Sequence, residues 1–338
     1  MPKLRVEAQR KLSGKKALII HDGILRVPLP DDFTKIALPY RIIGSVNHNG
    51  TRLNESIPFR FPFLGPLEEL EEIVKRESVD AIILPGTGPV DPDLGSALAR
   101  CGSLGVELRT LPGIYEEATG KALLSPTDHG WFVSQVAGTT DSPPYLVIKR
   151  ILDVVFSSIA LSAFSLLLPF IAAGIRLSSP GSIFIRQDRV GKSGKLLKMW
   201  KLRTMIWDAE GDGQPVWAQA DDKRVTSFGK FLRRTKLDEV PQFWNVLKGE
   251  MSIVGPRPER PYFVEQLETS VPYYGWRHSI KPGITGWAQI HQGYASSEEE
   301  SFEKSRYDLF YLKRRGILMD FLILAKTIPV VLRGKGSR

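Results

Sequence analysis

Two adjacent acidic residues, Asp238 and Glu239, lie in the segment of this 338-residue sequence that is richest in groups capable of chemistry. Pro241 follows them, and proline is tolerated in the first turn of a helix but not in its interior. The spacing therefore predicts a helix that begins near Asp238 and ends at Gly249.

A carboxylate at the start of a helix lies among unpaired N–H groups, at the positive end of the helix dipole. This position binds phosphate well and keeps a carboxylate ionised, so Asp238 could act as a nucleophile or as a metal ligand. The structural alternative is that Asp238 caps the helix while Glu239 complements its dipole. The pair of acids on its own does not decide between these roles.

Basic residues surround this pair in the sequence. Arg233 precedes it and Arg257 follows it, while Lys201 and Arg203 share one face of a strand predicted over residues 201–205. Such residues suit an anionic ligand, but they are also common on solvated surfaces.

The composition excludes several kinds of site. The single cysteine, Cys101, cannot form an intrachain disulfide or supply a cysteine-based zinc or iron–sulfur site. The five histidines form no HExxH motif. A single cysteine also fits a reducing, cytoplasmic environment.

Basic charge is concentrated in the second part of the chain. Residues 1–144 carry a net charge of −2, whereas residues 145–338 carry +11. A basic region can bind nucleic acid, but here it adjoins an apolar run of membrane length. That combination favours an anionic lipid surface, or a phosphorylated substrate held at one, so we expect membrane lipids and no nucleic acid as partners.

The apolar run extends over 22 uncharged residues, from Val154 to Ile175. As a helix it would be about 33 Å long, enough to cross a hydrocarbon core of about 30 Å. Pro169 lies inside it and should kink or break the helix. Because basic residues flank both ends, and such residues prefer the cytoplasmic side, the pattern favours a re-entrant membrane helix over residues 150–176. A kinked spanning helix and a buried soluble helix remain the alternatives.

The pattern in residues 1–144 predicts an α/β domain. Short buried strands are expected at 17–20, 40–46, 79–85 and 105–109, and helices at 67–76 and 94–101. This alternation is typical of a parallel sheet. The first strand is followed by His21-Asp22-Gly23 rather than a GxGxxG motif, and Gly86-Thr87-Gly88 lacks a third glycine. A regulatory or assembly role is therefore favoured over dinucleotide binding, and Thr140–Pro144 is interpreted as a linker.

Ordered motifs fill the second part of the chain. They are Lys149-Arg150 with Asp153, Ser179-Pro180-Gly181, Gln187, Arg189-Val190-Gly191, Lys201 to Met205, Leu237 to Gln242, Asn245 to Gly249, Met251 to Pro258 and Lys281 to Gln289. With these motifs the sequence from about Lys149 to Arg333 resembles the bacterial polyprenyl-phosphate sugar-1-phosphate transferases, the monotopic phosphoglycosyl transferases that begin the assembly of exopolysaccharides and other surface glycans. Residues 1–144 resemble the Rossmann-like domain that larger members carry.

The resemblance implies a fold and a reaction. The fold is a Rossmann-like α/β domain over residues 1–144, followed by a mostly α, membrane-associated catalytic domain over residues 145–338 with a Pro169-broken re-entrant helix and interfacial amphipathic helices. The reaction transfers a sugar-1-phosphate from a UDP-sugar to undecaprenyl phosphate through a phosphosugar-aspartyl intermediate, and it releases UMP. The alternative is a catalytically inactive, membrane-anchored scaffold.

The resemblance also implies roles for residues and partners. Asp238 is the expected nucleophile, and Glu239 assists with a metal or with the acceptor. The substrate phosphates are expected to bind Lys201, Arg203, Arg233 and Arg257, together with a Mg²⁺ ion ligated by Asp238. The expected location is the inner membrane of a bacterium, with the catalytic domain on the cytoplasmic face, and a homodimer is left open.

The C-terminal segment 307–332 alternates apolar turns with basic residues. This pattern is typical of interfacial helices whose basic side chains extend toward the headgroups. A soluble amphipathic helix docked on the core is the alternative.

Overall fold

The computed structural model describes residues 14–21, 36, 38–47, 61–84, 86, 92–124, 141–207, 222–292 and 297–332. The chain forms two units, Met1–Gly138 and Thr139–Arg338, each with its own core.

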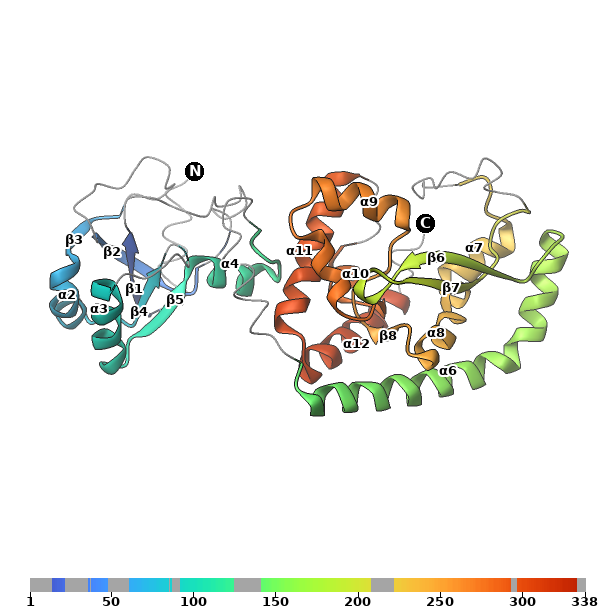
Figure 1. Ribbon diagram of the computed structural model, residues 1–338, viewed down its shortest axis with the longest axis horizontal. Helices are drawn as coiled ribbons and strands as arrows, with labels where there is room; N and C mark the ends of the chain where they lie inside the picture. Colours follow the sequence, from blue (N-terminus) through green and yellow to red (C-terminus); the bar gives the residue numbers. More distant parts are fainter. Residues whose placement is uncertain are drawn as a thin grey trace. The chain divides into compact units, whose positions relative to one another are not determined.

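The first unit is built on a parallel five-stranded sheet with strand order β3-β2-β1-β4-β5 (Figure 1). Its described elements are β1 (Lys16–His21), β2 (Arg41–Asn47), β3 (Phe63–Pro66), the 3₁₀ helix η2 (Leu67–Glu69), α2 (Leu70–Glu77), β4 (Ala81–Leu84), α3 (Pro92–Ser103), β5 (Glu107–Thr110) and α4 (Leu111–Thr119). The strand order changes direction between β1 and β4.

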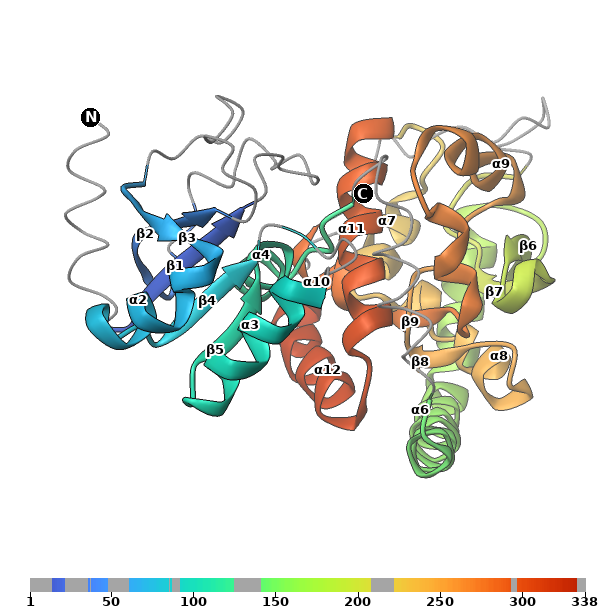
Figure 2. The ribbon, with the colours of Figure 1, turned by 60° about the vertical axis from the view of Figure 1, so that its left-hand side comes forward.

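The core of this unit lies between the sheet and the helices α2 and α3, which lie next to each other (Figure 2). Leu18 and Ile82 of the sheet pack with Ile73 of α2 and Leu98 of α3. Nearly every residue of β1 is buried, because a central parallel strand is covered on both faces.

The predicted strands and helices of this unit correspond to β1, β2, β4, β5, α2 and α3, so the α/β class and the parallel sheet are confirmed. The strand β3 and the helix α4 were not expected. Most of the two glycine-containing turns, His21-Asp22-Gly23 and Gly86-Thr87-Gly88, lies outside the described residues.

Helices predominate in the second unit. Its described elements are α6 (Pro143–Ser178), β6 (Phe184–Val190), η3 (Lys192–Gly194), β7 (Leu196–Leu202), α7 (Ser227–Arg234), η4 (Leu237–Glu239), α8 (Gln242–Lys248), β8 (Ser252–Val254), α9 (Pro261–Ser270), η5 (Tyr274–Ser279), β9 (Gly283–Thr285), α10 (Trp287–His291), α11 (Glu298–Arg314) and α12 (Ile317–Leu332). The antiparallel pair β6–β7 and the parallel pair β8–β9 form two small sheets.

The long apolar segment forms α6, a single helix of 36 residues, and two of the expected linker residues, Pro143 and Pro144, form its first turn. Pro169 lies inside α6 without ending it, so the expected break takes the form of a bend: Figure 1 shows that the C-terminal part of α6 turns away from its N-terminal part. Among the described helices, α6 is the one long and apolar enough to cross a membrane, and only 17% of its most apolar window is buried.

Polar residues near the start of α6 are bound inside the unit. Both terminal nitrogens of Arg150 donate to carbonyls at the end of α8, those of Val246 at 2.6 Å and Leu247 at 2.7 Å. Asp153, which is 5% exposed, accepts hydrogen bonds from the Ser252 hydroxyl and the Ile253 amide of β8. These residues therefore join α6 to the elements that follow Asp238.

A second contact joins the same end of α6 to α12. Lys149 donates to the carbonyl of Val254 at 3.0 Å and pairs with Asp320 at 2.6 Å. The Asp320 carboxylate also accepts from the hydroxyls of Tyr145 and Tyr311.

The far end of α6 packs on the same unit. Ile171 and Ile175 lie in one cluster with Leu202 of β7 and Leu232 of α7. The carbonyls of Ser179 and Pro180, which follow the helix, accept hydrogen bonds from Arg203. Both ends of α6 therefore contact one folded body.

The C-terminal segment divides into two different helices. In α11 the apolar residues Leu309, Phe310 and Leu312 are buried, so the expectation of an interfacial helix is wrong for this part, because those side chains fill the core. In α12 the side chains of Leu318 and Phe321 are exposed.

We expect Arg150→Leu to lower the free energy of unfolding by about 2–4 kcal/mol, because two hydrogen bonds from a charged donor are lost and two carbonyls at the end of α8 lose their partner. The measurement is urea denaturation in detergent micelles. Arg176→Leu is the matched control, since Arg176 lies exposed on the same helix. Equal losses in the two variants would contradict this role of Arg150.

Candidate active site

The two acidic residues lie in a short turn rather than at the start of a long helix. Lys236 has φ 60° and ψ 13°, Leu237–Glu239 form a 3₁₀ turn, and α8 begins only at Gln242. Gly249 ends α8 with φ 82°, a left-handed conformation that suits glycine. The predicted end of the helix is confirmed, and its predicted start is replaced by the turn.

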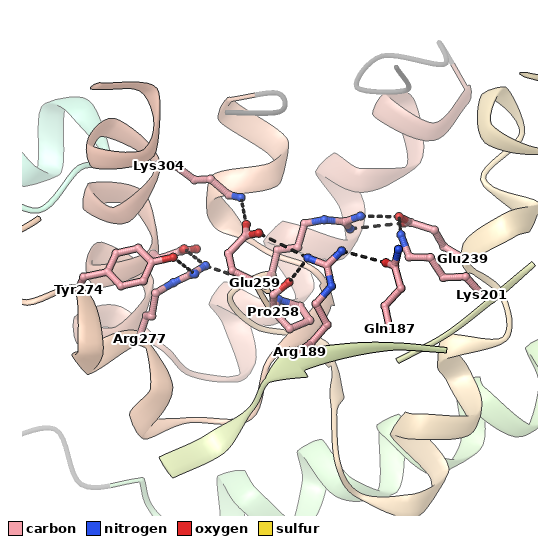
Figure 3. A network of polar contacts seen from close by, with 11 residues as sticks. Gln187, Arg189, Lys201, Glu239, Pro258, Glu259, Tyr274, Arg277 and Lys304 are labelled. Atoms are coloured by element: carbon pink, nitrogen blue, oxygen red, sulfur yellow. Dashed lines mark hydrogen bonds and ion pairs between the residues drawn. The ribbon is translucent and has the colours of Figure 1, made fainter. Parts of the chain in front are cut away.

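Glu239 is neutralised by two cations that come from distant parts of the chain (Figure 3). Its carboxylate pairs with Lys201 of β7 at 3.3 Å and with Arg257 at 2.5 Å. Burial alone would raise the pKa of Glu239, but Arg257 and Lys201 outweigh it and hold this pKa well below the ordinary value.

Asp238 lies in a different environment from its neighbour. Its side chain is 7% exposed, and its Oδ1 atom has no hydrogen-bond partner. Burial and the charge of Glu239 raise the pKa of Asp238 to about 6, against the opposing effect of Lys201 and other cations. We expected the helix N-terminus to favour the ionised form, but burial and the like charge dominate, because a three-residue turn contributes little dipole. The carboxylate is still mainly ionised at pH 7.

Lys201 reaches Glu239 because β7 is fastened to α8. The side chain of Asn245, which is fully buried, donates to the carbonyl of Lys198 at 2.9 Å and accepts from the amide of Trp200 at 3.2 Å. One amide side chain thus fixes the strand directly before Lys201.

Arg257 is held by the loop in which it lies. Arg277 donates to the carbonyl of Arg257 at 2.8 Å and pairs with Asp308 at 2.7 Å, with both side chains of this pair 2% exposed. The loop also approaches β9 closely: a Cβ at Gly283 would lie 2.1 Å from the amide nitrogen of Gly255, so only glycine fits there.

A second buried cluster of charged side chains, centred on Glu259, adjoins the loop that carries Arg257 (Figure 3). Glu259 pairs with Lys304 of α11 at 2.7 Å and with Arg189 of β6 at 3.5 Å. Although burial opposes it, Lys304 and Arg189 lower the pKa of Glu259 to about 2. These buried pairs anchor the loop that carries Arg257.

An open cavity of about 880 Å³ begins at Glu239. Lys236, Glu239, Arg257 and Lys304 contribute charged groups to its wall. Most of its other lining residues are apolar and come largely from α6 and α12, with one from α8: among them are Phe156, Ile159, Phe243, Phe321, Leu324 and Ile328. The cavity therefore offers charge beside a long apolar surface. Asp238 is not among the residues that line the cavity, although it is the sequence neighbour of Glu239, which does.

Two of the four expected phosphate-binding residues lie elsewhere. The guanidinium of Arg233 donates to the hydroxyl of Thr204 at 2.9 Å, and its charge lowers the pKa of Asp238. Arg203 is buried and donates to the carbonyls of Ser179 and Pro180, where burial lowers its pKa. The structure thus brings Lys201 and Arg257 to Glu239, leaves Arg233 within electrostatic range of Asp238, and binds Arg203 to the end of α6.

The donor atoms fit a metal ion only in part. Within the described ranges, no three Asp, Glu, His or Cys residues form a group that could hold a metal ion. Asp238 offers one oxygen without a hydrogen-bond partner, and Mg²⁺ often binds through one or two carboxylates together with substrate phosphates. The residues therefore fit a Mg²⁺ ion that arrives with a diphosphate.

Residues 144–334 match the family model described as bacterial sugar transferase. The chain belongs to this family. Over 241 residues it is 40% identical to the UDP-N-acetylgalactosamine-undecaprenyl-phosphate N-acetylgalactosaminephosphotransferase of Aeromonas hydrophila, a match that covers 71% of this chain and 56% of the relative. Over 277 residues it is 33% identical to the UDP-glucose:undecaprenyl-phosphate glucose-1-phosphate transferase of Xanthomonas campestris pv. campestris, covering 81% and 57%.

An enzyme of Escherichia coli strain K12 with that same printed name is 43% identical over 184 residues, which are 54% of this chain and 39% of the relative. The chain spans about half the length of these relatives. Family membership confirms the resemblance drawn from the ordered motifs, and the family match begins at the start of α6.

Several residues of the site were not among the predicted ones. Lys236 is one of the basic residues that precede Asp238 in the sequence, but it was not among the four predicted to bind phosphate. Glu259 and Lys304 are 45 residues apart in the sequence, so no local pattern indicated their pairing.

Because the pKa values of Asp238 and Glu239 shift in opposite directions, neutralising the two acids should change the free energy of unfolding in opposite directions. The pKa of Asp238 is raised in the folded protein, so its ionisation opposes folding as the pH rises from about 4 through 6. We expect Asp238→Asn to increase the free energy of unfolding at pH 7 by about 1–3 kcal/mol, and this gain to vanish near pH 4.

Glu239→Gln should instead lower the free energy of unfolding at pH 7 by about 3 kcal/mol, because Arg257 and Lys201 lose a buried partner. Since the pKa of Glu239 is lowered, this stability is present above about pH 4.3 and is lost at more acidic pH, where the variant and the parent converge. Urea denaturation at pH 4 and pH 7 measures the effect of Asp238→Asn, and a series continued to pH values well below 4 follows the convergence of Glu239→Gln with the parent. A loss of stability in Asp238→Asn at pH 7 would contradict the assignment.

Proposed function

We propose that this protein transfers a sugar-1-phosphate from a UDP-sugar to undecaprenyl phosphate, and so starts the assembly of a surface glycan. Family membership and the printed names of the relatives support the reaction class. The observation that carries the proposal is the asymmetry of the acidic pair: Glu239 is bound by two cations, whereas Asp238 Oδ1 has no hydrogen-bond partner.

In the first step, a carboxylate oxygen of Asp238 attacks the phosphorus that bears the sugar. The bond from this phosphorus to the bridging oxygen breaks, UMP leaves with that oxygen, and a phosphosugar-aspartyl enzyme forms. Asp238 suits this role because it is mainly ionised at pH 7 and its Oδ1 atom has no hydrogen-bond partner. Glu239 is the weaker candidate, because Lys201 and Arg257 neutralise its charge.

The diphosphate must reach Asp238, which is buried and does not line the cavity. Lys201 and Arg257 are the cations that bind its neighbour Glu239 in the free protein. A diphosphate competes with Glu239 for both cations, since phosphate oxygens are strong acceptors for arginine and lysine. The release of Glu239 then opens access to its neighbour. A Mg²⁺ ion, held by Asp238 and the phosphates, would neutralise further charge on the phosphate oxygens.

In the second step, an oxygen of undecaprenyl phosphate attacks the same phosphorus and the bond to Asp238 breaks, which restores the carboxylate. The cavity beside Glu239 suits this acceptor, because its apolar walls match an isoprenoid chain and its charged residues match a phosphate.

The contacts of α6 support a monotopic protein at the cytoplasmic membrane. Arg150 at one end and Ile175 at the other both pack on the same catalytic unit. A helix that crossed a bilayer would place its ends on opposite sides, so these contacts favour a re-entrant or surface-lying helix. The exposed apolar side chains of α12 would lie in the same interface.

The strand order of the first unit supports a Rossmann-like domain. Its sheet is parallel with order 3-2-1-4-5, which is the order of a doubly wound mononucleotide-binding sheet and its continuation. We infer a regulatory or assembly role for this unit.

We expect the purified protein to release one equivalent of UMP from a UDP-sugar in the absence of any lipid acceptor. A panel containing UDP-glucose and UDP-N-acetylgalactosamine identifies the sugar, and intact mass of the quenched enzyme should show the added sugar-phosphate. The rate of this burst should decrease as the pH is lowered below about 6, because the attack needs ionised Asp238.

Asp238→Asn should abolish the burst although it is folded and at least as stable as the parent. Glu265→Gln is a matched control, because Glu265 lies exposed on α9, away from the acidic pair. A burst that survives Asp238→Asn would refute the nucleophile, and a parent protein without any burst would favour an inactive scaffold.

The topology can be tested with cysteines at the two ends of α6. In a Cys101→Ser background, Ser142→Cys and Ser178→Cys should both react with an impermeant maleimide from the cytoplasmic side of membrane vesicles. Labelling of the two positions from opposite sides would establish a spanning helix instead.

A further inference from the structure

Lys236 adopts a backbone conformation that is unfavourable for its residue type. Its φ of 60° and ψ of 13° lie in the left-handed region, where a Cβ atom is disfavoured and glycine is not. Residues other than glycine keep such conformations where the surrounding structure holds them, and these positions gather at functional sites. A long cationic side chain at a position that suits glycine is a reason to ask what the side chain binds.

The position of Lys236 connects the acidic pair to the cavity. It lies two residues before Asp238 and lines the cavity together with Glu239 and Arg257. Burial lowers the pKa of Lys236, and Glu239 and Asp238 oppose this shift. The ammonium group is therefore within electrostatic range of both carboxylates while it belongs to the cavity wall.

The cavity that Lys236 lines suits the lipid acceptor better than the nucleotide sugar. Its apolar walls come largely from α6 and α12, whose outer faces expose many apolar side chains. A lipid chain would cover these walls, whereas the hydroxyls and the base of a nucleotide sugar would leave them unmatched. Lys201 and Arg257 contact Glu239 and are assigned to the diphosphate. Lys236 is another cation close to the acidic pair Asp238 and Glu239, and it lines the apolar cavity.

We propose that Lys236 binds the phosphate of the polyprenyl acceptor and positions its attacking oxygen for the step that restores Asp238. This role rests on the proposed function and assigns one residue to the second substrate. The same cation could in principle bind the donor diphosphate, and the two half-reactions separate these sources of phosphate.

The decisive variant is Lys236→Gly, because it removes the cation and relieves the backbone at the same time. We expect an unfolding temperature equal to or above that of the parent. The Michaelis constant for undecaprenyl phosphate should rise, and the acceptor-dependent rate should fall about tenfold or more relative to the UMP burst, as the loss of one charged contact to the reacting phosphate predicts. Lys236→Arg keeps the charge and should recover part of the rate.

Ser193→Gly is the matched control. Ser193 has φ 57° in the turn between β6 and β7, so glycine relieves the backbone there without removing a charge. It should leave both half-reactions unchanged.

An unchanged Michaelis constant and acceptor-dependent rate in Lys236→Gly would overturn the proposal. A UMP burst that falls as much as the acceptor step would also overturn it, because Lys236 would then serve the donor. Failure of the parent protein to release UMP is a different result: it would refute the proposed function itself, and the role of Lys236 with it.

Discussion

The organisation of the site depends on one short turn, Leu237–Glu239, which places two adjacent carboxylates in different electrostatic environments. Several cations surround the neighbouring carboxylates of Asp238 and Glu239, and both Lys201 and Arg257 form ion pairs with Glu239. Asp238 is left buried with an uncompensated oxygen, and its pKa rises while that of Glu239 falls. The side chains of adjacent residues point about 100° apart in an α-helix and about 120° apart in a 3₁₀ turn, so the two carboxylates face different directions. The chain thus binds one acid to two cations and leaves an oxygen of the other without a hydrogen-bond partner.

The membrane-length helix belongs to this arrangement rather than serving as a separate anchor. Its first polar residues are bound to the elements that follow the acidic pair: Arg150 binds the end of α8, and Asp153 binds β8. Lys149 and Arg150, two of the basic residues that suggested lipid headgroups when read from sequence, therefore bind groups inside the protein. In the monotopic arrangement proposed above, a shift of α6 relative to the bilayer would act directly on the helix that follows Asp238, so the contacts that hold the shape of the site would also set its depth at the membrane.

The sequence predicted the features that depend on local pattern. Alternating strands and helices indicated the parallel sheet, Gly249 indicated the end of α8, and the uncharged run indicated α6. It could not predict which cation meets which carboxylate, because such pairing depends on packing between distant segments. Arg203 and Lys201 are two residues apart, yet Arg203 binds carbonyls after α6 while Lys201 binds Glu239. The raised pKa of Asp238 was missed for the same reason, since burial is a property of the folded unit.

The resting structure and the proposed reaction are linked by competition for the same two cations. In the free protein Glu239 binds Lys201 and Arg257, and this keeps buried positive charge compensated. In the proposed reaction Glu239 holds the place that the diphosphate takes. A diphosphate that displaces it brings more negative charge and more acceptor oxygens than a carboxylate does. The buried pair of Arg277 and Asp308 holds the Arg257 carbonyl in place. In the proposed reaction Glu239 would therefore leave while the backbone of Arg257 keeps its position, so that one anion replaces another on the same two cations.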